Sequence, residues 1–399
     1  MTDKMNILFC TWNYPPVVGG IEQVAHYTAL ELHQAGHHVE ILAAAAPAGD
    51  IPAIDQTDGI PIFRAQKKGI PRFLLHAVRE GNRRIRAHRP DWIFCPSLTS
   101  APAAWLLSKR HHIPYAVCIY GSDIVLASKT YQLGIRPLLT SAKRLFPISR
   151  ATTELLTRRG IPEDRICMIC PGVTPPPPPD TEPSDKIKAL AQAATGAPVV
   201  LTVGRLVRRK GVLEFIRDVF PLLKKRLPQA QYWVVGGEPK ASLIHQERIG
   251  DQLEAARQAS GYADSIHLLG RCSDADLDWA YRTASVFVLP CLDLPHDVEG
   301  FGIVLLEAAL KNVPSVATRC GGIPDAVLDG ETGLLVPPGQ PEAMAETLAD
   351  LLQQPERLAT MGRAGERRAR EFFNWTAVAA RYAAALQAAL PMAPASRQP

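Results

Sequence analysis

Short apolar runs alternate with stretches of helical periodicity along most of the chain. Each run is short enough for one buried strand, and each is followed by a helical stretch or a loop. This alternation predicts an α/β protein with two doubly wound, mostly parallel sheets. The expected strands of the first sheet are residues 6–10, 39–42, 92–95, 115–119, 145–148 and 166–169, and those of the second are 199–203, 232–235, 266–269, 286–289, 315–317 and 334–336.

Five consecutive prolines, Pro175 to Pro179, separate the two sets of strands. Such a run is stiff and extended and cannot join a helix. We therefore expect an N-terminal domain over residues 1–174, a proline-rich linker over 175–197 and a second domain over 198–370. The segment 371–390 is expected to form a helix that packs back on the N-terminal domain.

Composition narrows the class of protein. The 399 residues are 47% hydrophobic and 21% charged, which suits a globular protein of two domains. No apolar run approaches the roughly 18 residues of a membrane span, and the residues before the first strand are too few for a signal peptide. The eight cysteines are scattered as reduced thiols would be, so the expected compartment is the cytoplasm.

Basic residues concentrate in the first half of the chain. Residues 1–170 contain 20 Lys and Arg against 13 Asp and Glu, and six arginines fall within Arg72–Arg89. This amphipathic segment has two interpretations: a solvated helix with one core-facing stripe, which we favour, or a peripheral contact with the inner face of an anionic membrane. Nucleic acid is not expected as a partner, because the basic residues are not interleaved with aromatic side chains on which bases could stack.

The strongest candidate for chemistry is the stretch Asp297–Glu307. It follows an apolar run and opens a helix at Gly302, so Glu299 lies in a strand-to-helix loop and Glu307 about a turn and a half inside the helix. At a rise of about 1.5 Å per residue, both carboxylates can line one crevice at the end of a strand. The amides of Gly302 and Ile303 lie between them and would seat a phosphate. Carboxylates that bind hydroxyl groups and amides that bind a diphosphate are together suited to a nucleotide-sugar. The alternative interpretation of this stretch is an ordinary capped helix with no ligand.

Two further loops have the composition of a phosphate site. Residues 204–211 carry four cations directly after the first strand of the second sheet. The pair Gly19-Gly20 opens a helix after the first strand of the chain, where the backbone can approach a ligand closely. Taken singly, each loop is also consistent with an ordinary turn.

Together these segments resemble glycosyltransferase family 4, whose members are retaining enzymes with two Rossmann-like domains facing a cleft, the GT-B fold. The resemblance spans most of the chain, in the family's order. The sequence of Asp297–Ile303 is particularly similar to the corresponding segment of bacterial GDP-mannose-dependent mannosyltransferases. Elsewhere in the family, the same motif occurs in enzymes that use UDP-sugars. The matching segments are Gly19–Glu22, Gly204–Leu206, Lys210-Gly211, Gly270-Arg271, Glu299–Glu307 (the family's E-x7-E), Gly321–Asp325 and Phe372–Trp375.

The resemblance implies a role for each matching residue. Arg205 and Lys210 would neutralise the diphosphate as it leaves, Glu299 would hold hydroxyl groups of the donor sugar, and Glu307 would accept hydrogen bonds from the ribose. The implied donor-binding set is Gly19, Gly20, Arg205, Lys210, Arg271, Glu299, Gly300, Phe301, Gly302, Ile303, Val304 and Glu307.

One segment departs from the family. Where many members have His-Gly-x-Asp or His-Gly-x-Glu, this chain has Tyr120-Gly121-Ser122-Asp123. A tyrosine hydroxyl can form a hydrogen bond there but is no base at neutral pH, which leaves Asp123 as the best ionisable candidate on the acceptor side. The expected catalytic residues are Asp123, Tyr120, Glu299, Arg205 and Lys210, with no metal or other cofactor, because the two cations supply the positive charge.

The implied reaction moves a hexose, with mannose favoured, from a nucleotide-diphosphate sugar to a lipid-linked or glycan acceptor in cell-envelope or polysaccharide synthesis. Attack on the same face would retain the anomeric configuration, with the leaving phosphate accepting the acceptor's proton. Glu299 would bind rather than protonate the bond, unlike the paired carboxylates of glycosidases. The alternatives are a GT-B UDP-sugar isomerase or hydrolase, a small-molecule glycoside synthase of the same family, and a catalytically silent scaffold.

Overall fold

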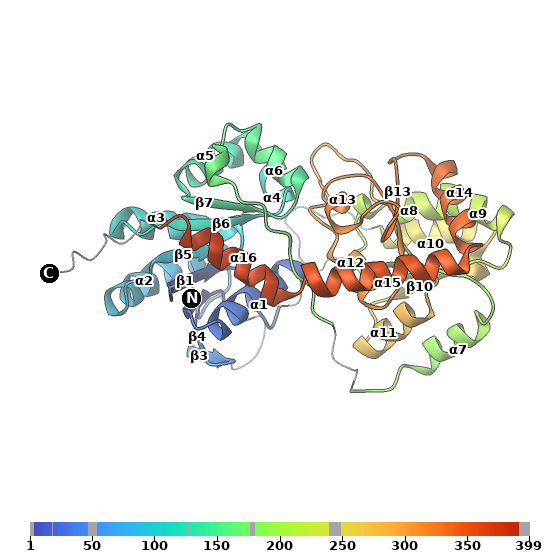
Figure 1. Cartoon of the computed structure of the whole chain (residues 1–399), viewed down its shortest axis with the longest axis horizontal. Helices are drawn as coiled ribbons and strands as arrows, with labels where there is room; N and C mark the ends of the chain where they lie inside the picture. Colours follow the sequence, from blue (N-terminus) through green and yellow to red (C-terminus); the bar gives the residue numbers. More distant parts are fainter. Residues whose placement is uncertain are drawn as a thin grey trace. The chain divides into compact units, whose positions relative to one another are not determined.

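The structure of the chain, a computed structural model, describes residues 4–17, 19–46, 54–126, 128–175, 180–238 and 249–390. The described residues form two compact units (Figure 1). Unit 1 comprises those of Met1–Gly172 and Trp375–Pro399, and unit 2 comprises those of Val173–Asn374. Each unit is an α/β domain built on its own sheet, which confirms the predicted fold class.

Unit 1 contains a seven-stranded sheet with the order β3-β4-β2-β1-β5-β6-β7. Neighbouring strands are parallel, except for the antiparallel pair β3 and β4 at one edge. The strands are β1 (Asn6–Thr11), β2 (His38–Ala43), β3 (Ile54–Thr57), β4 (Ile60–Arg64), β5 (Trp92–Cys95), β6 (Tyr115–Ile119) and β7 (Arg144–Pro147). The helices are α1 (Gly20–Gln34), α2 (Ile70–Ala87), α3 (Ala101–His111), α4 (Ser122–Val125), α5 (Lys129–Ser141), α6 (Arg150–Thr157) and α16 (Trp375–Gln387).

Helices cover both faces of this sheet. On one face α16 lies beside α1 (Figure 1), and Tyr382 of α16 is buried against Phe94 and Phe146 of the strands. The start of α16 approaches the backbone so closely that a Cβ at Gly172 would overlap the ring of Trp375. Helices α2, α3 and α5 contribute to the core on the opposite face.

The predicted strand at residues 166–169 is wrong. The amides of Cys167 and Ile169 donate to the carbonyl oxygens of Leu145 and Pro147 on β7, but only an isolated bridge forms, at Ile166. Proline has no N–H group, so Pro147 cannot return a hydrogen bond and the parallel ladder ends there.

The hairpin of β3 and β4 was not predicted. It turns at Asp58 and Gly59, both with positive φ, of 55° and 82°. An Asp-Gly pair between two strands is a strong signal for a two-residue hairpin, so this element could have been found from the sequence.

Unit 2 contains a six-stranded, fully parallel sheet with the order β10-β9-β8-β11-β12-β13. All six strands match predicted ones. They are β8 (Val199–Val203), β9 (Gln231–Val235), β10 (Ile266–Gly270), β11 (Val286–Leu289), β12 (Ser315–Thr318) and β13 (Gly333–Val336). The helices are α7 (Asp185–Ala193), α8 (Val212–Glu214), α9 (Phe220–Arg226), α10 (Gly250–Ala259), α11 (Asp274–Thr283), α12 (Ile303–Leu310), α13 (Ile323–Ala326), α14 (Pro341–Leu352) and α15 (Pro355–Phe372).

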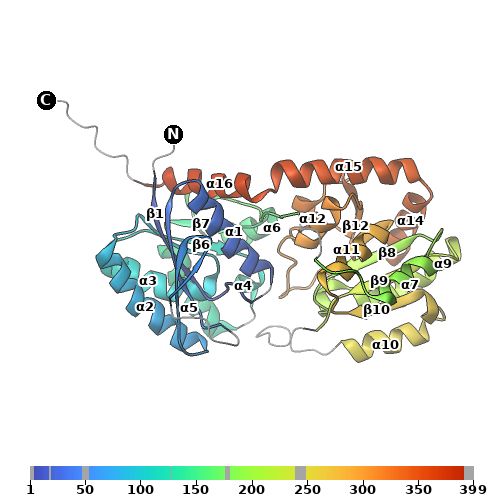
Figure 2. The ribbon, with the colours of Figure 1, turned by 90° about the horizontal axis from the view of Figure 1, so that it is seen from below.

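Several helices of unit 2 pack against its sheet. The segment from α8 to α9, together with α10 and α14, shares one hydrophobic core with the strands. Helix α15 packs along α12 (Figure 2).

In the segment expected to be a linker, α7 contacts α11, and the Ser184 amide donates to Asp276 at 2.7 Å. Most of the predicted proline run, residues 176–179, lies outside the described residues.

Candidate functional site

Two adjacent strands of unit 2 bring their following loops together. Strands β8 and β11 are neighbours, so the loop at residues 204–211 meets the loop that begins at Pro290. Gly211 has a left-handed backbone with φ of 67°, and a Cβ there would overlap the carbonyl oxygen of Pro290. The amide of Leu292 donates to the carbonyl oxygen of Arg209 at 2.8 Å. The glycine therefore permits a contact that positions the cations of the first loop against the acids of the second.

Buried charged side chains form an ion network at this contact. The Glu299 carboxylate lies 2.9 Å from Lys210 Nζ and 3.0 Å from Arg209 Nε, and Arg209 also pairs with Asp297. Arg209, Lys210 and Glu299 are only 6%, 8% and 7% exposed, so water screens their attraction weakly. Glu299 and Lys210, which were predicted from separate motifs, are thus in direct contact.

The network determines how these groups ionise. Burial by itself would raise the pKa of Glu299, but the charges of Lys210 and Arg209 outweigh it and lower that pKa to about 2. Burial also opposes the charge of Arg209, whose pKa is nevertheless raised by Glu299 and Asp297. Glu299 is therefore a carboxylate at neutral pH, which can accept hydrogen bonds from hydroxyl groups but has no proton to donate.

Glu307, the second acid of the predicted pair, lies half-buried in α12. Its Oε2 accepts a hydrogen bond of 3.1 Å from the hydroxyl of Tyr281 in α11. Burial raises the pKa of Glu307, and the Tyr281 hydrogen bond and the charge of Lys210 offset this effect only in part. Lys210 is thus the cation to which both carboxylates respond.

Glycines shape the backbone around Glu299 and the start of α12. Gly322 donates its amide to the Glu299 carbonyl oxygen at 2.8 Å, and a Cβ at Gly321 would overlap the same oxygen. Gly302, with φ of 85°, immediately precedes Ile303, the first residue of α12. Amides in the first turn of a helix lack intrahelical partners, so the start of α12 suits a phosphate.

The other predicted donor residues of unit 2 have varied surroundings. The side chain of Phe301 packs against Phe373 with ring centroids 5.7 Å apart, so this side chain belongs to the core. Arg205 is exposed, and Arg271 donates to the carbonyl oxygen of Glu238 at 3.1 Å. Gly300, Ile303 and Val304 are half-buried.

Sequence reasoning missed Arg209 and Tyr281. Arg209 is one of four cations in its loop, and nothing in the linear pattern distinguishes it from Arg208. Tyr281 lies 26 residues before Glu307 in a different helix, so no spacing rule connects the two.

Unit 1 has a polar cluster of its own at the carboxyl ends of β1 and β5. The turn Gly19-Gly20 opens α1, and a Cβ at Gly19 would overlap the carboxylate of Glu22. Asn13 donates to Glu22 Oε1 at 2.7 Å, and Ser97 donates to Asn13 Oδ1 at 3.3 Å. The predicted glycines therefore accompany three polar side chains that were not predicted as site residues.

Tyr120 and Asp123 lie in the turn after β6. Both carboxylate oxygens of Asp123 accept from the Tyr120 amide at 3.2 Å. Burial raises the pKa of Asp123 to about 6, although backbone hydrogen bonds act in the opposite direction. The Tyr120 hydroxyl has no hydrogen-bond partner among the described residues, and burial raises its pKa well above the ordinary value. Tyr120 is therefore a neutral phenol, while Asp123 supports the turn.

We expect Asp123→Asn to change the pH dependence of folding. Because the folded-state pKa of about 6 exceeds the ordinary value of 3.8, ionisation of Asp123 favours the unfolded chain. Wild-type stability should therefore fall by up to about 3 kcal/mol, relative to the variant, as pH rises from about 4 to above 6. Urea unfolding at pH 4 and pH 7 measures this difference, and a gap between the two proteins that stays constant with pH would contradict the raised pKa.

We expect Tyr120→Phe to leave stability unchanged or higher, because it removes a buried hydroxyl that has no partner among the described residues. The rate of sugar transfer by this variant should fall by at most about tenfold, because the change removes at most one neutral hydrogen bond to a substrate. Single-turnover kinetics measure the rate, and a loss above about a thousandfold in a folded variant would require a chemical role for the phenol.

Among the described residues, no three His, Cys, Asp or Glu side chains are grouped to hold a metal ion. All eight cysteines are free thiols. In the same described ranges, no helix has both the length and the apolar character needed to cross a membrane.

Comparison with known proteins connects both units to one family. Residues 19–172 match the glycosyl transferase 4-like domain, and residues 197–354 match the glycosyl transferases group 1 domain. The chain is 36% identical to a GDP-mannose-dependent alpha-(1-6)-phosphatidylinositol monomannoside mannosyltransferase of Mycolicibacterium smegmatis, over 82% of this chain and 90% of the relative. It is 29% identical to a D-inositol 3-phosphate glycosyltransferase of Streptomyces avermitilis, over 93% and 84% of the two chains.

The fold is also similar to solved structures. Sucrose-phosphate synthase from Thermosynechococcus elongatus superposes with a TM-score of 0.76 at 23% identity, covering 95% of this chain and 97% of the other.

Proposed function

This chain is a glycosyltransferase that belongs to family 4, and on this premise we propose that it transfers mannose from GDP-mannose to a lipid-linked or glycan acceptor with retention of configuration. The observation that carries the nucleotide-sugar chemistry is the buried network of Lys210, Arg209 and Glu299 beside the start of α12. Mannose and GDP are supported by the 36% identity to an enzyme named for GDP-mannose.

In the proposed reaction the bond between the anomeric carbon and the diphosphate oxygen breaks, and negative charge develops on the leaving phosphate. Lys210 has three N–H donors, so it can stabilise this charge while one donor remains on Glu299. Arg205 and the first amides of α12 would add to this stabilisation. The acceptor hydroxyl attacks the same face of the sugar, and its proton passes to the leaving phosphate oxygen.

The two carboxylates bind the donor in this proposal. Glu299, ionised because of its two cationic neighbours, accepts hydrogen bonds from sugar hydroxyls and orients the ring. Glu307 accepts from a ribose hydroxyl, a contact that would compensate for its burial. Neither residue is required to protonate the breaking bond, because a stabilised diphosphate leaves without a general acid.

The donor can be tested by thermal unfolding with GDP, UDP, ADP and dTDP. A nucleotide at about 100 times its Kd should stabilise the folded protein by about 2.7 kcal/mol, and we expect GDP to do so at the lowest concentration. NMR of the product from GDP-mannose then reports the anomeric configuration. Preference for UDP would overturn the donor assignment, an inverted product would overturn retention, and an epimerised sugar formed without acceptor would favour the isomerase.

A second acceptor class is a phosphorylated polyol. The 29% identity to a D-inositol 3-phosphate glycosyltransferase supports it. Incubation with GDP-mannose and either phosphatidylinositol mannosides or inositol phosphate distinguishes the classes, because only the true acceptor should accelerate release of GDP.

We expect Glu307→Ala to weaken binding of the free nucleotide diphosphate by about 1.5–3 kcal/mol, the value of a hydrogen bond to a charged group. Isothermal titration calorimetry measures this loss. Glu356→Ala, an exposed change in α15, serves as the control and should leave the Kd unchanged. An unaltered Kd in the Glu307 variant would remove this residue from the ribose site.

We also propose that unit 1 binds the inner face of an anionic membrane through α2. The helix buries Phe73, Ala77 and Ile85 in the core, and such a stripe is compatible with both interpretations of this segment, a solvated helix and a membrane contact. Its outer surface presents exposed Arg72, Arg79, Arg83 and Arg86, together with Leu75, which is 53% exposed. Such a surface is suited to anionic lipid headgroups.

We expect the double change Arg79→Glu and Arg83→Glu to reduce sedimentation with phosphatidylglycerol vesicles at least about tenfold, because each arginine near an anionic surface contributes about 1 kcal/mol. Phosphatidylcholine vesicles are the matched control and should bind neither protein. Equal binding of the wild type to both lipids would contradict an electrostatic contact.

A further inference from the structure

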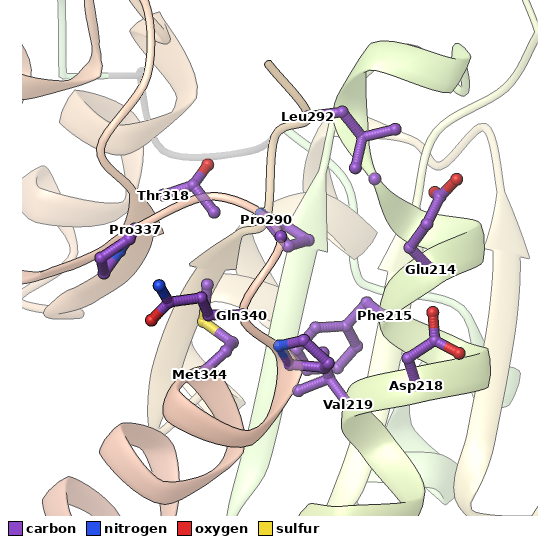
Figure 3. A pocket seen from close by; sticks show the side chains of 13 residues that line it. Glu214, Phe215, Asp218, Val219, Pro290, Leu292, Thr318, Pro337, Gln340 and Met344 are labelled. Atoms are coloured by element: carbon purple, nitrogen blue, oxygen red, sulfur yellow. The ribbon is translucent and has the colours of Figure 1, made fainter. Parts of the chain in front are cut away.

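Unit 2 contains a pocket of about 280 Å³ to which no role has been assigned (Figure 3). One wall is the helical segment that follows β8, and the facing wall is the loop from β13 into α14. Phe215, Val219 and Met344 provide its apolar lining, and its polar side chains include Glu214, Asp218 and Gln340.

The two carboxylates of the pocket lie one helical turn apart on the same wall. Glu214 Oε2 is shielded from water and accepts no hydrogen bond from the described residues. Its other oxygen is 3.9 Å from Arg208, which is a weak pairing on an exposed guanidinium. A buried carboxylate oxygen without a donor is energetically unfavourable, so it provides a binding position for a ligand N–H group.

Asp218 adds a second carboxylate, whose side chain is 36% exposed. Both of its oxygens accept hydrogen bonds of 2.7 Å from its neighbour Arg217, whose side chain is 62% exposed and is not part of the lining, so a ligand cation would compete with a solvated guanidinium. No Lys, Arg or His occurs among the described residues that line the pocket, so its polar wall is acidic.

The backbone of this wall is irregular. Residues Phe215–Val219 form a single π-helical turn between α8 and α9. Phe215, Asp218 and Val219 from this turn all line the pocket. Such turns are rare and often occur at functional sites, which makes this wall more than an ordinary helix surface.

The pocket is separate from the donor site, although the two are adjacent. It shares Gly211 and Pro290 with the contacting loops, but Lys210, Glu299 and Glu307 are not among its lining residues. The acidic wall would repel a diphosphate, so the nucleotide is not its ligand.

We propose that this pocket binds a small organic cation, with its ammonium group on Glu214 and Asp218 and its apolar body against Phe215, Val219 and Met344. Ionised acceptors form the strongest hydrogen bonds with charged N–H donors, and the apolar lining favours a hydrocarbon body over a ring of hydroxyl groups. This inference is independent of the sugar and acceptor proposed above.

The test uses the full chain and benzylamine, a cation with a flat apolar body, as the probe. Its neutral analogue benzyl alcohol is the matched control ligand. Calorimetry and saturation-transfer NMR measure binding to the wild type, to the isosteric variants Glu214→Gln and Asp218→Asn, and to the remote control Glu356→Gln. Thermal unfolding verifies that each variant is folded.

We expect saturable binding of benzylamine, weakened at least about tenfold in Glu214→Gln and in Asp218→Asn and unchanged in Glu356→Gln. Benzyl alcohol should bind more weakly and be insensitive to the substitutions. Absence of saturable benzylamine binding, or equal binding of both probes, would overturn the proposal. Binding of methyl α-mannoside that is lost in Glu214→Gln would also overturn it and assign the pocket to carbohydrate.

Discussion

Lys210→Ala is expected to lower kcat by about 100- to 1000-fold while weakening donor binding by less than about tenfold. The ammonium group stabilises charge that develops only as the diphosphate leaves, so its contribution appears mainly in the transition state. Glu299 retains Arg209 at 3.0 Å in this variant, so the network does not collapse and the protein should remain folded. Steady-state kinetics with saturating acceptor give kcat and KM, and calorimetry gives the nucleotide Kd.

A matched control lies in the same turn of the loop. Arg208 is two residues from Lys210, but its side chain is 58% exposed and pairs only weakly with Glu214. Arg208→Ala should keep kcat within about threefold, because a solvated charge contributes little. If Lys210→Ala raised KM alone and left kcat intact, the lysine would bind the ground state and the proposed leaving-group role would be wrong.

The second large effect concerns Glu299→Gln, which should reduce both stability and activity. The change keeps the shape of the side chain but removes the charge that balances Lys210 and part of Arg209. Removing one partner of a buried ion pair typically lowers the free energy of unfolding by about 3–5 kcal/mol. Activity should fall as well, because a neutral amide both orients sugar hydroxyls less strongly and holds Lys210 less firmly.

The pH dependence provides an independent check of this effect. The pKa of Glu299 is lowered to about 2 in the folded protein from an ordinary 4.5, so its contribution is fully present above about pH 4.5 and is lost as pH falls toward 2. A shift of this size corresponds to about 3 kcal/mol. Wild type and variant should therefore differ by a constant amount between pH 5 and 7 and converge below pH 4.5.

Urea unfolding across this pH range measures the convergence, with Glu331→Gln, an exposed change outside the network, as the control. A variant as stable as the wild type at pH 7 would show that the ion pairs do not stabilise the fold. Full stability combined with lost activity would instead confine Glu299 to a role in binding the substrate.

The sequence alone was sufficient to predict the strands of unit 2 and the E-x7-E pair. Buried parallel strands such as β8 and β11 are continuous apolar runs, which can be recognised without knowledge of their neighbours. Glu299 and Glu307 are separated by one loop and a short helical stretch, so local geometry already limits the distance between them. The same local rules wrongly predicted a strand at residues 166–169. There Pro147, which lies on the neighbouring strand, ends the ladder of hydrogen bonds.

Tertiary structure alone decided which cations of the loop after β8 are buried against Glu299. Composition and spacing do not rank the four cations of this loop, and the family resemblance singled out Arg205 and Lys210. In the structure, only Arg209 and Lys210 of the four are buried against Glu299. That difference depends on Gly211 meeting Pro290, a contact between loops that leave neighbouring strands. Burial, pairing and pKa are set by groups distant along the chain, and for this reason the sequence shows which charged residues the loop contains while only the fold shows which of them are buried together.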